Sequence, residues 1–148
     1  MSDKKKLKNI FVQGPISATF IAESIQKHST QTTIGGHSIF LGQVRADEVL
    51  NGIVSAIVYT AFEEMALDKM HLIREDIFSK YPLTCMHVYH SLGTVSAGEI
   101  CLFVFTSSAH RQAAMEACEE TVERLKAELP VWGKEIMQNE SHQWKVNR

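Results

Sequence analysis

One long amphipathic helix in the C-terminal third constrains the fold more than any other segment of this chain. Residues 106–135 open with Thr-Ser-Ser-Ala-His-Arg and continue in a helical pattern. The pattern ends at Leu129, because the residue before a proline is pushed out of the helical region. Ser107 or Ser108 is the expected N-cap. The side predicted to be buried consists of Ala114, Cys118, Thr121, Val122 and Leu125. Cationic and titratable groups stand at both helix ends, so we expect chemistry there.

The rest of the chain alternates between strand and helix patterns. Strands are predicted over residues 10–12, 37–45, 53–61, 84–90 and 99–106, and further helices over residues 17–27 and 63–80. The last of these strands contains Ile-Cys-Leu-Phe-Val-Phe, which is apolar on both faces and therefore typical of a central strand. The helix over residues 63–80 is expected to bury Ala66, Met70, Ile73 and Ile77.

Two loops are predicted from turn residues. We expect the strands over residues 37–45 and 53–61 to pair like a hairpin across a loop over residues 46–51, with Asn51-Gly52 as its turn. A second loop, containing Gly93 and Gly98, is expected between the last two strands.

Length and charge limit the classes of function. A chain of 148 residues fits a single domain over residues 1–148. The net charge of -2 argues against a general electrostatic grip on nucleic acid or on an anionic membrane. No apolar run approaches the roughly 18 residues of a membrane span, and no signal peptide is evident, so we expect a cytoplasmic protein. Cys85, Cys101 and Cys118 are odd in number and widely spaced, which favours reduced, buried thiols.

Each end of the long helix carries a candidate site. His110 and Arg111 stand at its start, where free backbone N–H groups and the helix dipole suit a phosphate or a carboxylate. Lys126 lies in its last turn and Lys134 just beyond Pro130, and a partly buried lysine can act as general acid, general base or nucleophile. The plainer alternatives are a surface ion pair for Arg111 and lysines that merely complement the helix dipole.

A metal site is not expected. His87 and His90 are three positions apart in a predicted strand, so their side chains point to opposite faces and cannot share one ion. The glycines at positions 35, 36 and 42 do not form a recognised phosphate-binding loop, and no Ser-His-Asp order stands out.

Several short motifs, in their order along the chain, resemble the large, catalytic subunit of molybdopterin synthase. The resemblance covers roughly residues 35–145. The matching pieces are FLGQVR at 40–45, YTAFEEMA at 59–66, His90 with Gly93 and Gly98, SAHR at 108–111, and residues 125–135 with Lys126, Pro130 and Trp132.

The resemblance implies an α+β fold of the α/β hammerhead type, with a mostly antiparallel sheet and about three helices. It also implies a homodimer within a heterotetramer, whose partners are small ubiquitin-like sulfur carriers ending in a Gly-Gly thiocarboxylate. The enzyme is a sulfurtransferase that converts cyclic pyranopterin monophosphate to molybdopterin. It needs no metal or other cofactor of its own.

Site residues follow from the same resemblance. Lys126 matches the principal catalytic lysine, and a second lysine normally follows the tryptophan directly, where this chain has Gly133. Lys134 comes one step later and replaces that amine only if Gly133 bends the backbone. The expected substrate-binding residues are Gln43, Arg45, His110, Arg111 and Glu135.

The length of the helix adds a geometric expectation. From Arg111 to Lys126 is 15 positions, or about 22 Å along one helix, so one small substrate cannot touch both ends. We therefore expect a pocket shared across a twofold dimer, with Arg45 and Lys126 from one chain and His110 and Arg111 from the other. Two alternatives remain: a non-catalytic dimeric scaffold that binds the carrier tail, which the glycine at 133 favours, and a phosphoester hydrolase that uses His110.

Overall fold

A computed structural model describes residues 7–50, 52–139 and 141–146. Within those ranges the helices are α1 (Ala18–Lys27), α2 (Glu63–Lys80) and α3 (Arg111–Glu128), with a 3₁₀ turn η1 (His28–Thr30) after α1. The strands are β1 (Phe11–Gln13), β2 (Gly36–Gln43), β3 (Glu48–Val49), β4 (Gly52–Ala61), β5 (Leu83–Ser96), β6 (Ile100–Ser108), β7 (Val131–Met137) and β8 (His142–Trp144). None of the helices in these ranges is long and apolar enough to cross a membrane.

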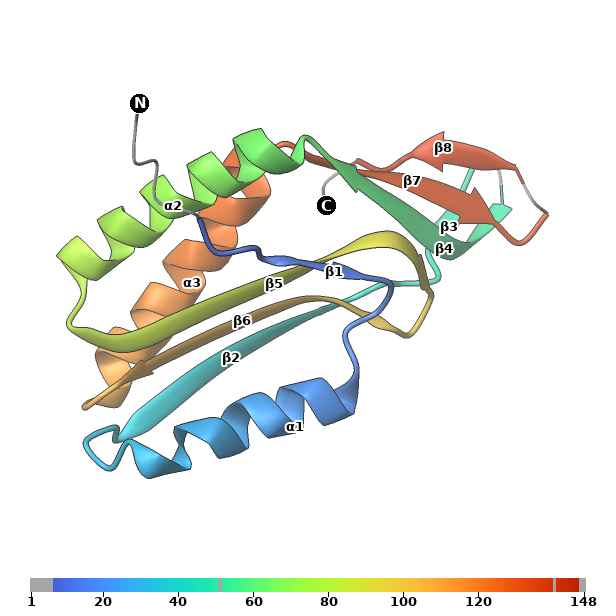
Figure 1. Ribbon diagram of the computed structural model, residues 1–148. Coiled ribbons are helices and arrows are strands. Elements are labelled where there is room, and N and C mark those ends of the chain that lie inside the picture. Colours follow the sequence, from blue (N-terminus) through green and yellow to red (C-terminus); the bar gives the residue numbers. More distant parts are fainter. Residues whose placement is uncertain (1–6, 51, 140, 147–148) are drawn as a thin grey trace.

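The strands form one sheet in the order β2-β6-β5-β4-β7-β8, while β1 pairs with β5 and β3 pairs with β4. The β1–β5 pair is parallel and the others are antiparallel. Helices α2 and α3 cover one face of the sheet and α1 covers the other (Figure 1). Strands β4, β7 and β8 extend beyond the helices at one end. The predicted α+β fold with three helices and a mostly antiparallel sheet is confirmed.

Strand β6 is central, as predicted, because its side chains are buried on both faces. Leu102 and Val104 belong to the large core cluster with residues of α2 and α3, whereas Phe103 and Phe105 pack with Phe20 of α1 in a second cluster. Burying one such side chain contributes roughly 1.5–3 kcal/mol to stability. The burial of β6 on both faces therefore contributes much of the free energy that stabilises the packing of the helices on the sheet. The residues expected to be buried in α2 and α3 are also buried.

The hairpin predicted between the second and third strands is wrong. Strand β2 pairs with β6, and β4 pairs with β5 and β7, so β2 and β4 are separated in the sheet. The long β5–β6 hairpin lies between them because its apolar strand must be covered on both sides. The loop expected over residues 46–51 contains β3, and Asn51 of its predicted turn lies outside the described residues.

Two other boundaries differ from the prediction. Gly93, placed in a loop, lies within β5 at a positive φ of 80°, where the strand exchanges β6 for β4 as its neighbour. Ser107 and Ser108 belong to β6, and His110 takes the N-cap position of α3. The serine hydroxyls have other partners: Ser107 Oγ lies 2.7 Å from His37 Nδ1, and Ser108 Oγ donates to the Pro82 carbonyl at 2.9 Å.

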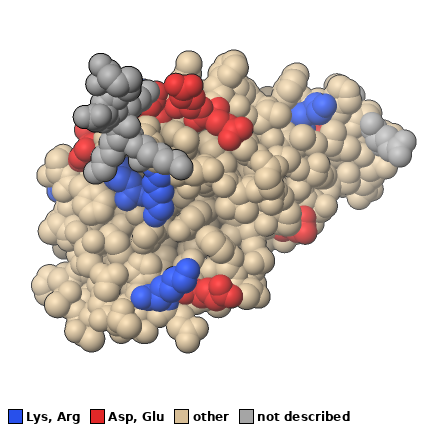
Figure 2. Space-filling view, viewed as in Figure 1, with Lys and Arg blue, Asp and Glu red and all other residues tan. Residues whose placement is uncertain are grey.

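Charged residues are spread over the surface in small groups. On the face that Figure 2 shows, lysine and arginine side chains stand in separate places, some of them next to acidic side chains. This distribution is what a chain with a net charge of -2 leads one to expect.

Candidate active site

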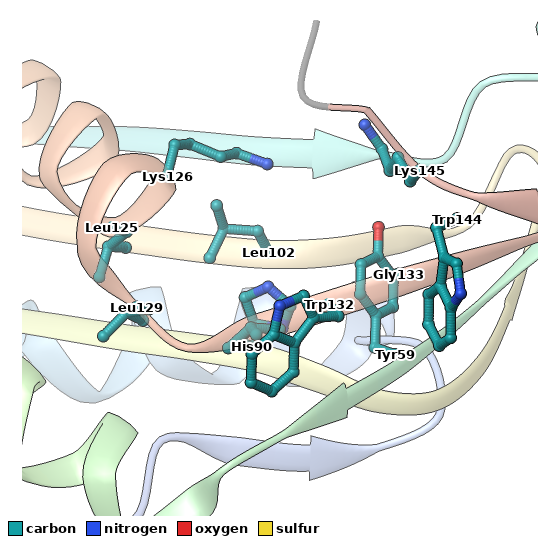
Figure 3. A pocket seen from close by; sticks show the side chains of 11 residues that line it. Tyr59, His90, Leu102, Leu125, Lys126, Leu129, Trp132, Gly133, Trp144 and Lys145 are labelled. Carbon is teal, nitrogen blue, oxygen red and sulfur yellow. The ribbon is translucent and has the colours of Figure 1, made fainter.

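Two neighbouring cavities open where the end of α3 meets β4, β7 and β8, and both are lined by Tyr59, Lys126 and Lys145. The first has a volume of about 170 Å³. Its apolar walls include Leu102, Leu125, Leu129, Trp132 and Trp144, and His90 and Gly133 complete its lining with Val131. Figure 3 shows the Lys126 side chain extending from the end of α3 toward the side on which Lys145 and the hydroxyl of Tyr59 lie.

The second cavity is more polar and has a volume of about 220 Å³. The segment from Phe40 to Arg45 forms one wall, and Asp47, Ile57, Cys101 and Glu135 contribute to the others. The two cavities therefore meet at a pair of lysines, with an apolar space on one side and polar side chains on the other.

Lys126 reaches both cavities from the last turn of α3, which ends two residues later at Glu128. The backbone of Leu129 is extended (φ -75°, ψ 133°), as expected before a proline, and its N–H still donates to the Leu125 carbonyl. Leu125 is buried in the core while Lys126, one position on, turns toward the cavities. Figure 3 shows its side chain extending away from the helix above Leu102.

His90 and Tyr59 are held neutral beneath the lysines. Burial lowers the pKa of His90 to about 4, and the Lys126 ammonium nearby acts in the same direction. His90 Nδ1 lies 2.8 Å from the Ser91 carbonyl, which can only accept, so Nδ1 carries the proton and Nε2 is left as an acceptor. Burial, followed by the neighbouring Cys101 and Glu135, raises the pKa of Tyr59. At neutral pH the positive charge around the cavities therefore comes from Lys126, Lys145 and Arg45 and not from His90.

Of the predicted substrate-binding residues, Gln43, Arg45 and Glu135 line the second cavity. Arg45 donates from Nε and from one terminal nitrogen to the Asp47 carboxylate, at 3.1 and 3.3 Å. A guanidinium has five N–H donors, so this pairing orients Arg45 while other donors can still meet an anion. Glu135 is 1% exposed and accepts from the Gln143 amide at 2.9 Å.

His110 and Arg111 lie apart from this site within one chain. They are exposed at the start of α3 and line a separate surface cavity with Gln112, Met115 and Glu116. Because α3 runs straight on for 18 residues, the two ends of the helix cannot serve one small ligand in a single chain. The shared pocket across a dimer stays a prediction.

Lys134 leaves β7 on the face opposite Gly133 and Glu135, because successive side chains in a strand alternate. It is not among the residues that line either cavity. Its catalytic role stays a prediction. Lys145 was not foreseen, because its place depends on the pairing of β8 with β7, and no short-range pattern in a polar tail indicates that pairing.

A second cluster of titratable groups lies beneath α1. The donor atoms of His28, Cys85 and His87 come within 4.8 Å of one another, a set of imidazoles and a thiol that could hold a transition metal. No local pattern indicates this cluster, because His28 comes from η1 and the other two residues from β5. The expectation that the protein binds no metal stays a prediction.

Residues 13–128 match the model of a protein family described as "MoaE protein". Relatives named "Molybdopterin synthase catalytic subunit" include one from Pyrococcus abyssi, 38% identical over 116 residues, which are 78% of this chain and 77% of the relative. The human relative is 37% identical, over 77% of this chain and 60% of its own length. For the relative from Drosophila pseudoobscura pseudoobscura the identity is 36%, over 90% of this chain but only 36% of the relative.

Solved structures agree with the fold. A molybdopterin synthase structure from Staphylococcus aureus has a TM-score of 0.81 and 27% identity, over 96% of this chain and 100% of that one. A protein–protein complex of subunits 1 and 2 of the molybdopterin-converting factor from Helicobacter pylori has a TM-score of 0.79, over 93% of this chain and 90% of that one. Its identity is 18%, so this likeness concerns the fold alone.

Proposed function

The chain belongs to the MoaE protein family, and on this premise we propose that it is the catalytic subunit of a molybdopterin synthase, an enzyme of molybdenum cofactor biosynthesis. The named relatives at 35–38% identity support this assignment. The reaction is the transfer of sulfur from the C-terminal Gly-Gly thiocarboxylate of a small ubiquitin-like carrier to cyclic pyranopterin monophosphate. Two such transfers form the dithiolene of molybdopterin.

The junction of the two cavities at Lys126 is the observation that carries the proposal. The first cavity, of about 170 Å³ and walled largely by apolar side chains, can take a narrow chain segment such as the glycine tail of the carrier. The second cavity offers Arg45 and Gln43, whose donors suit the oxygens of a phosphate. A carrier tail and a pterin phosphate that enter from these two sides meet beside one amine.

Lys126 acts on the acyl group of the carrier in this proposal. The thiocarboxylate sulfur forms a bond to a side-chain carbon of the pterin, while a carbon–oxygen bond at that carbon breaks and the oxygen leaves with a proton. Water then attacks the acyl carbon and the acyl–sulfur bond breaks, so that the sulfur stays on the pterin and the carrier leaves with an ordinary carboxylate. The Lys126 ammonium stabilises the oxyanion that develops at the acyl carbon and supplies a proton to the leaving group. Transient acylation of the Lys126 amine, followed by hydrolysis, is the second route open to the same residue.

A twofold dimer completes the site in this proposal, with His110 and Arg111 supplied by the partner subunit. Strand β2 is at the edge of the sheet, and Ile39, Phe40 and Leu41 on it are each between 37% and 40% exposed. An exposed apolar edge strand next to a cavity favours burial against another chain. Two carriers bound to the dimer give the heterotetramer. The cytoplasm is the proposed compartment, supported by three free cysteines.

Incubation of the purified protein with a thiocarboxylated carrier and cyclic pyranopterin monophosphate tests the assignment. Formation of the dithiolene product, detected by mass spectrometry or as its fluorescent oxidation product, is the expected result. Carrier binding without product would instead identify the non-catalytic scaffold. Phosphate release in the absence of carrier would identify the hydrolase that uses His110.

A further inference from the structure

Position 133 cannot contribute an amine to the cavities. A Cβ atom built on Gly133 lies 2.8 Å from Ile57 Cγ2 and 3.3 Å from Tyr59 Cε1. Carbon atoms without a bond between them are most stable about 3.5–4.0 Å apart, so any side chain here displaces Ile57. Glycine instead lets the ring of Tyr59 lie across strand β7.

Strand β8 places a lysine directly beside this glycine. The Lys145 N–H donates to the Gly133 carbonyl at 2.7 Å, which continues the register that pairs Lys134 with Trp144. On the other side of β7, Gly133 pairs with Tyr59 of β4. Directly opposed residues of antiparallel strands point to the same face of the sheet. Tyr59, Gly133 and Lys145 therefore form one row across three strands, with side chains on one face.

Lys145 reaches from this row into the same space as Lys126. Both lysines line both cavities, and in Figure 3 the Lys126 side chain extends toward the side where Lys145 stands above the Tyr59 hydroxyl. They come from separate elements, the last turn of α3 and the end of β8, so their approach follows from the fold and not from neighbouring sequence. Lys134, whose Cβ points to the other face of β7, does not share this space.

We propose that Lys145 is the second amine of the active site and that its ammonium binds the anionic end of the carrier tail, opposite Lys126. The proposal rests on the proposed function and adds a residue to it. The end group is a carboxylate-type anion, the thiocarboxylate before transfer and the carboxylate after it. Six apolar side chains line the first cavity together with Lys145, so an anionic end group bound there needs a charged partner, which the Lys145 ammonium supplies.

Binding measurements with the full-length chain test the proposal without turnover. The probes are the carrier with its natural C-terminal carboxylate and the same carrier with a C-terminal amide, which has no charge. Wild-type protein is expected to prefer the carboxylate by about tenfold or more, as for a charge-assisted hydrogen bond. Lys145→Ala should reduce that preference to about twofold or less, and Lys145→Arg should retain most of it. Lys27→Ala, which removes an exposed lysine from α1, controls for net charge.

Three outcomes overturn the proposal. One is a Lys145→Ala variant that keeps the full preference for the carboxylate. Another is a larger loss of the preference in Lys134→Ala than in Lys145→Ala. The third is an unchanged preference with a raised KM for cyclic pyranopterin monophosphate, which would assign Lys145 to the phosphate. Circular dichroism checks that the variants fold, and Lys145→Gln repeats the test with a polar side chain of similar length.

A relocation experiment sharpens the test. In the triple variant Ile57→Ala, Gly133→Lys, Lys145→Ala, the space freed at 57 admits a lysine at 133, and part of the lost preference should return. Absence of any carrier binding or product with wild-type protein would contradict the proposed function itself. Wild-type binding and turnover together with an unaffected Lys145→Ala variant would contradict only the role of Lys145.

Discussion

Two of the clusters of titratable side chains in the described part of the chain differ in their surroundings: one lies beneath α1, and the other surrounds Lys126. In the cluster beneath α1, Lys8 Nζ donates to His87 Nδ1 at 2.9 Å, and the nitrogens His87 Nε2 and His28 Nε2 are 3.1 Å apart. His28 Nδ1 lies 2.7 Å from the Ser24 carbonyl, which can only accept. His28 Nε2 is therefore the acceptor, and the donors run in one direction from Lys8 to Ser24.

The cluster around Lys126 has the opposite character. Its neutral members, Tyr59 and His90, are buried, while the cationic Lys126 and Lys145 line two cavities. The histidine cluster satisfies its own hydrogen bonds inside the fold, and the lysine cluster presents its charge to a space that a ligand can enter. Proximity of titratable groups is thus a weaker sign of function than charge directed into a cavity.

Removal of the Lys126 amine should have the largest effect on activity of the changes that distinguish the two clusters. Lys126→Ala is expected to lower turnover by about 10²–10⁴-fold, the range of a lost acid–base group, while the Kd for the carrier changes by less than about threefold. Single-turnover assays and isothermal titration measure the two quantities. Lys27→Ala is a matched control, because Lys27 is likewise a lysine in the last turn of a helix. Wild-type turnover in Lys126→Ala would place the chemistry elsewhere.

A subunit-mixing experiment tests whether the lysine cluster is complete only in a dimer. Lys126→Ala and Arg111→Ala proteins are each expected to be inactive. In a mixed dimer one of the two pockets pairs an intact Lys126 with an intact Arg111 of the partner, so random mixing should restore about a quarter of wild-type activity. Activity of the unfolded and refolded mixture measures this. No recovery, with mixed dimers demonstrated by native mass spectrometry, would contradict the shared pocket.

Local patterns predicted the parts of the fold that depend on neighbours in sequence. The spacing of Ala66, Met70, Ile73 and Ile77 identified the buried side of α2, and the proline at 130 fixed the end of α3. The places of Lys126 and Arg45 could be predicted for the same reason, because each stands at or near the end of a predicted element, and both line the second cavity. Their roles in catalysis and substrate binding stay predictions.

The features that could not be predicted depend on pairing between strands that are distant in sequence. The partner of β2 depends on β6 needing cover on both faces, and the place of Lys145 depends on β8 folding back on β7. Lys134 follows Trp132 closely in sequence and is therefore a predicted second amine, but its side chain leaves β7 on the face opposite Gly133 and lines neither cavity. The row of Tyr59, Gly133 and Lys145 consists of residues that are distant in sequence, so no local hydrophobic pattern predicts it.

The histidine cluster should make the fold less stable as the pH falls. Burial lowers the pKa of His87 to about 4, with Lys8, His28 and Arg74 acting in the same direction. The unfolded chain, with an ordinary histidine pKa of about 6.5, therefore binds more protons than the folded chain between about pH 6.5 and 4, and stability falls as the pH falls through this window. The full shift corresponds to about 3 kcal/mol, which partial exposure of the ring reduces to about 1–2 kcal/mol.

Urea denaturation at pH 7 and pH 4.5 measures this loss. His90, whose pKa is also lowered to about 4, contributes with the same sign from the lysine cluster. His87→Gln should remove roughly half of the wild-type difference in unfolding free energy between the two pH values, and His90→Gln a comparable part. An unchanged difference in both variants would mean that neither imidazole is held neutral by its surroundings.

Addition of zinc should have the smallest effect, although His28, Cys85 and His87 offer suitable donor atoms. An ion bound to both Nε2 atoms must break the His87–His28 hydrogen bond, and His87 Nδ1 would then carry a proton that faces the Lys8 ammonium. The added charge would also lie near Lys8 and Arg74, whose charges already disfavour protonation of His87. We therefore expect equimolar Zn²⁺ to shift the Tm by less than about 1 °C. A larger rise that Cys85→Ser abolishes would make this cluster a metal site.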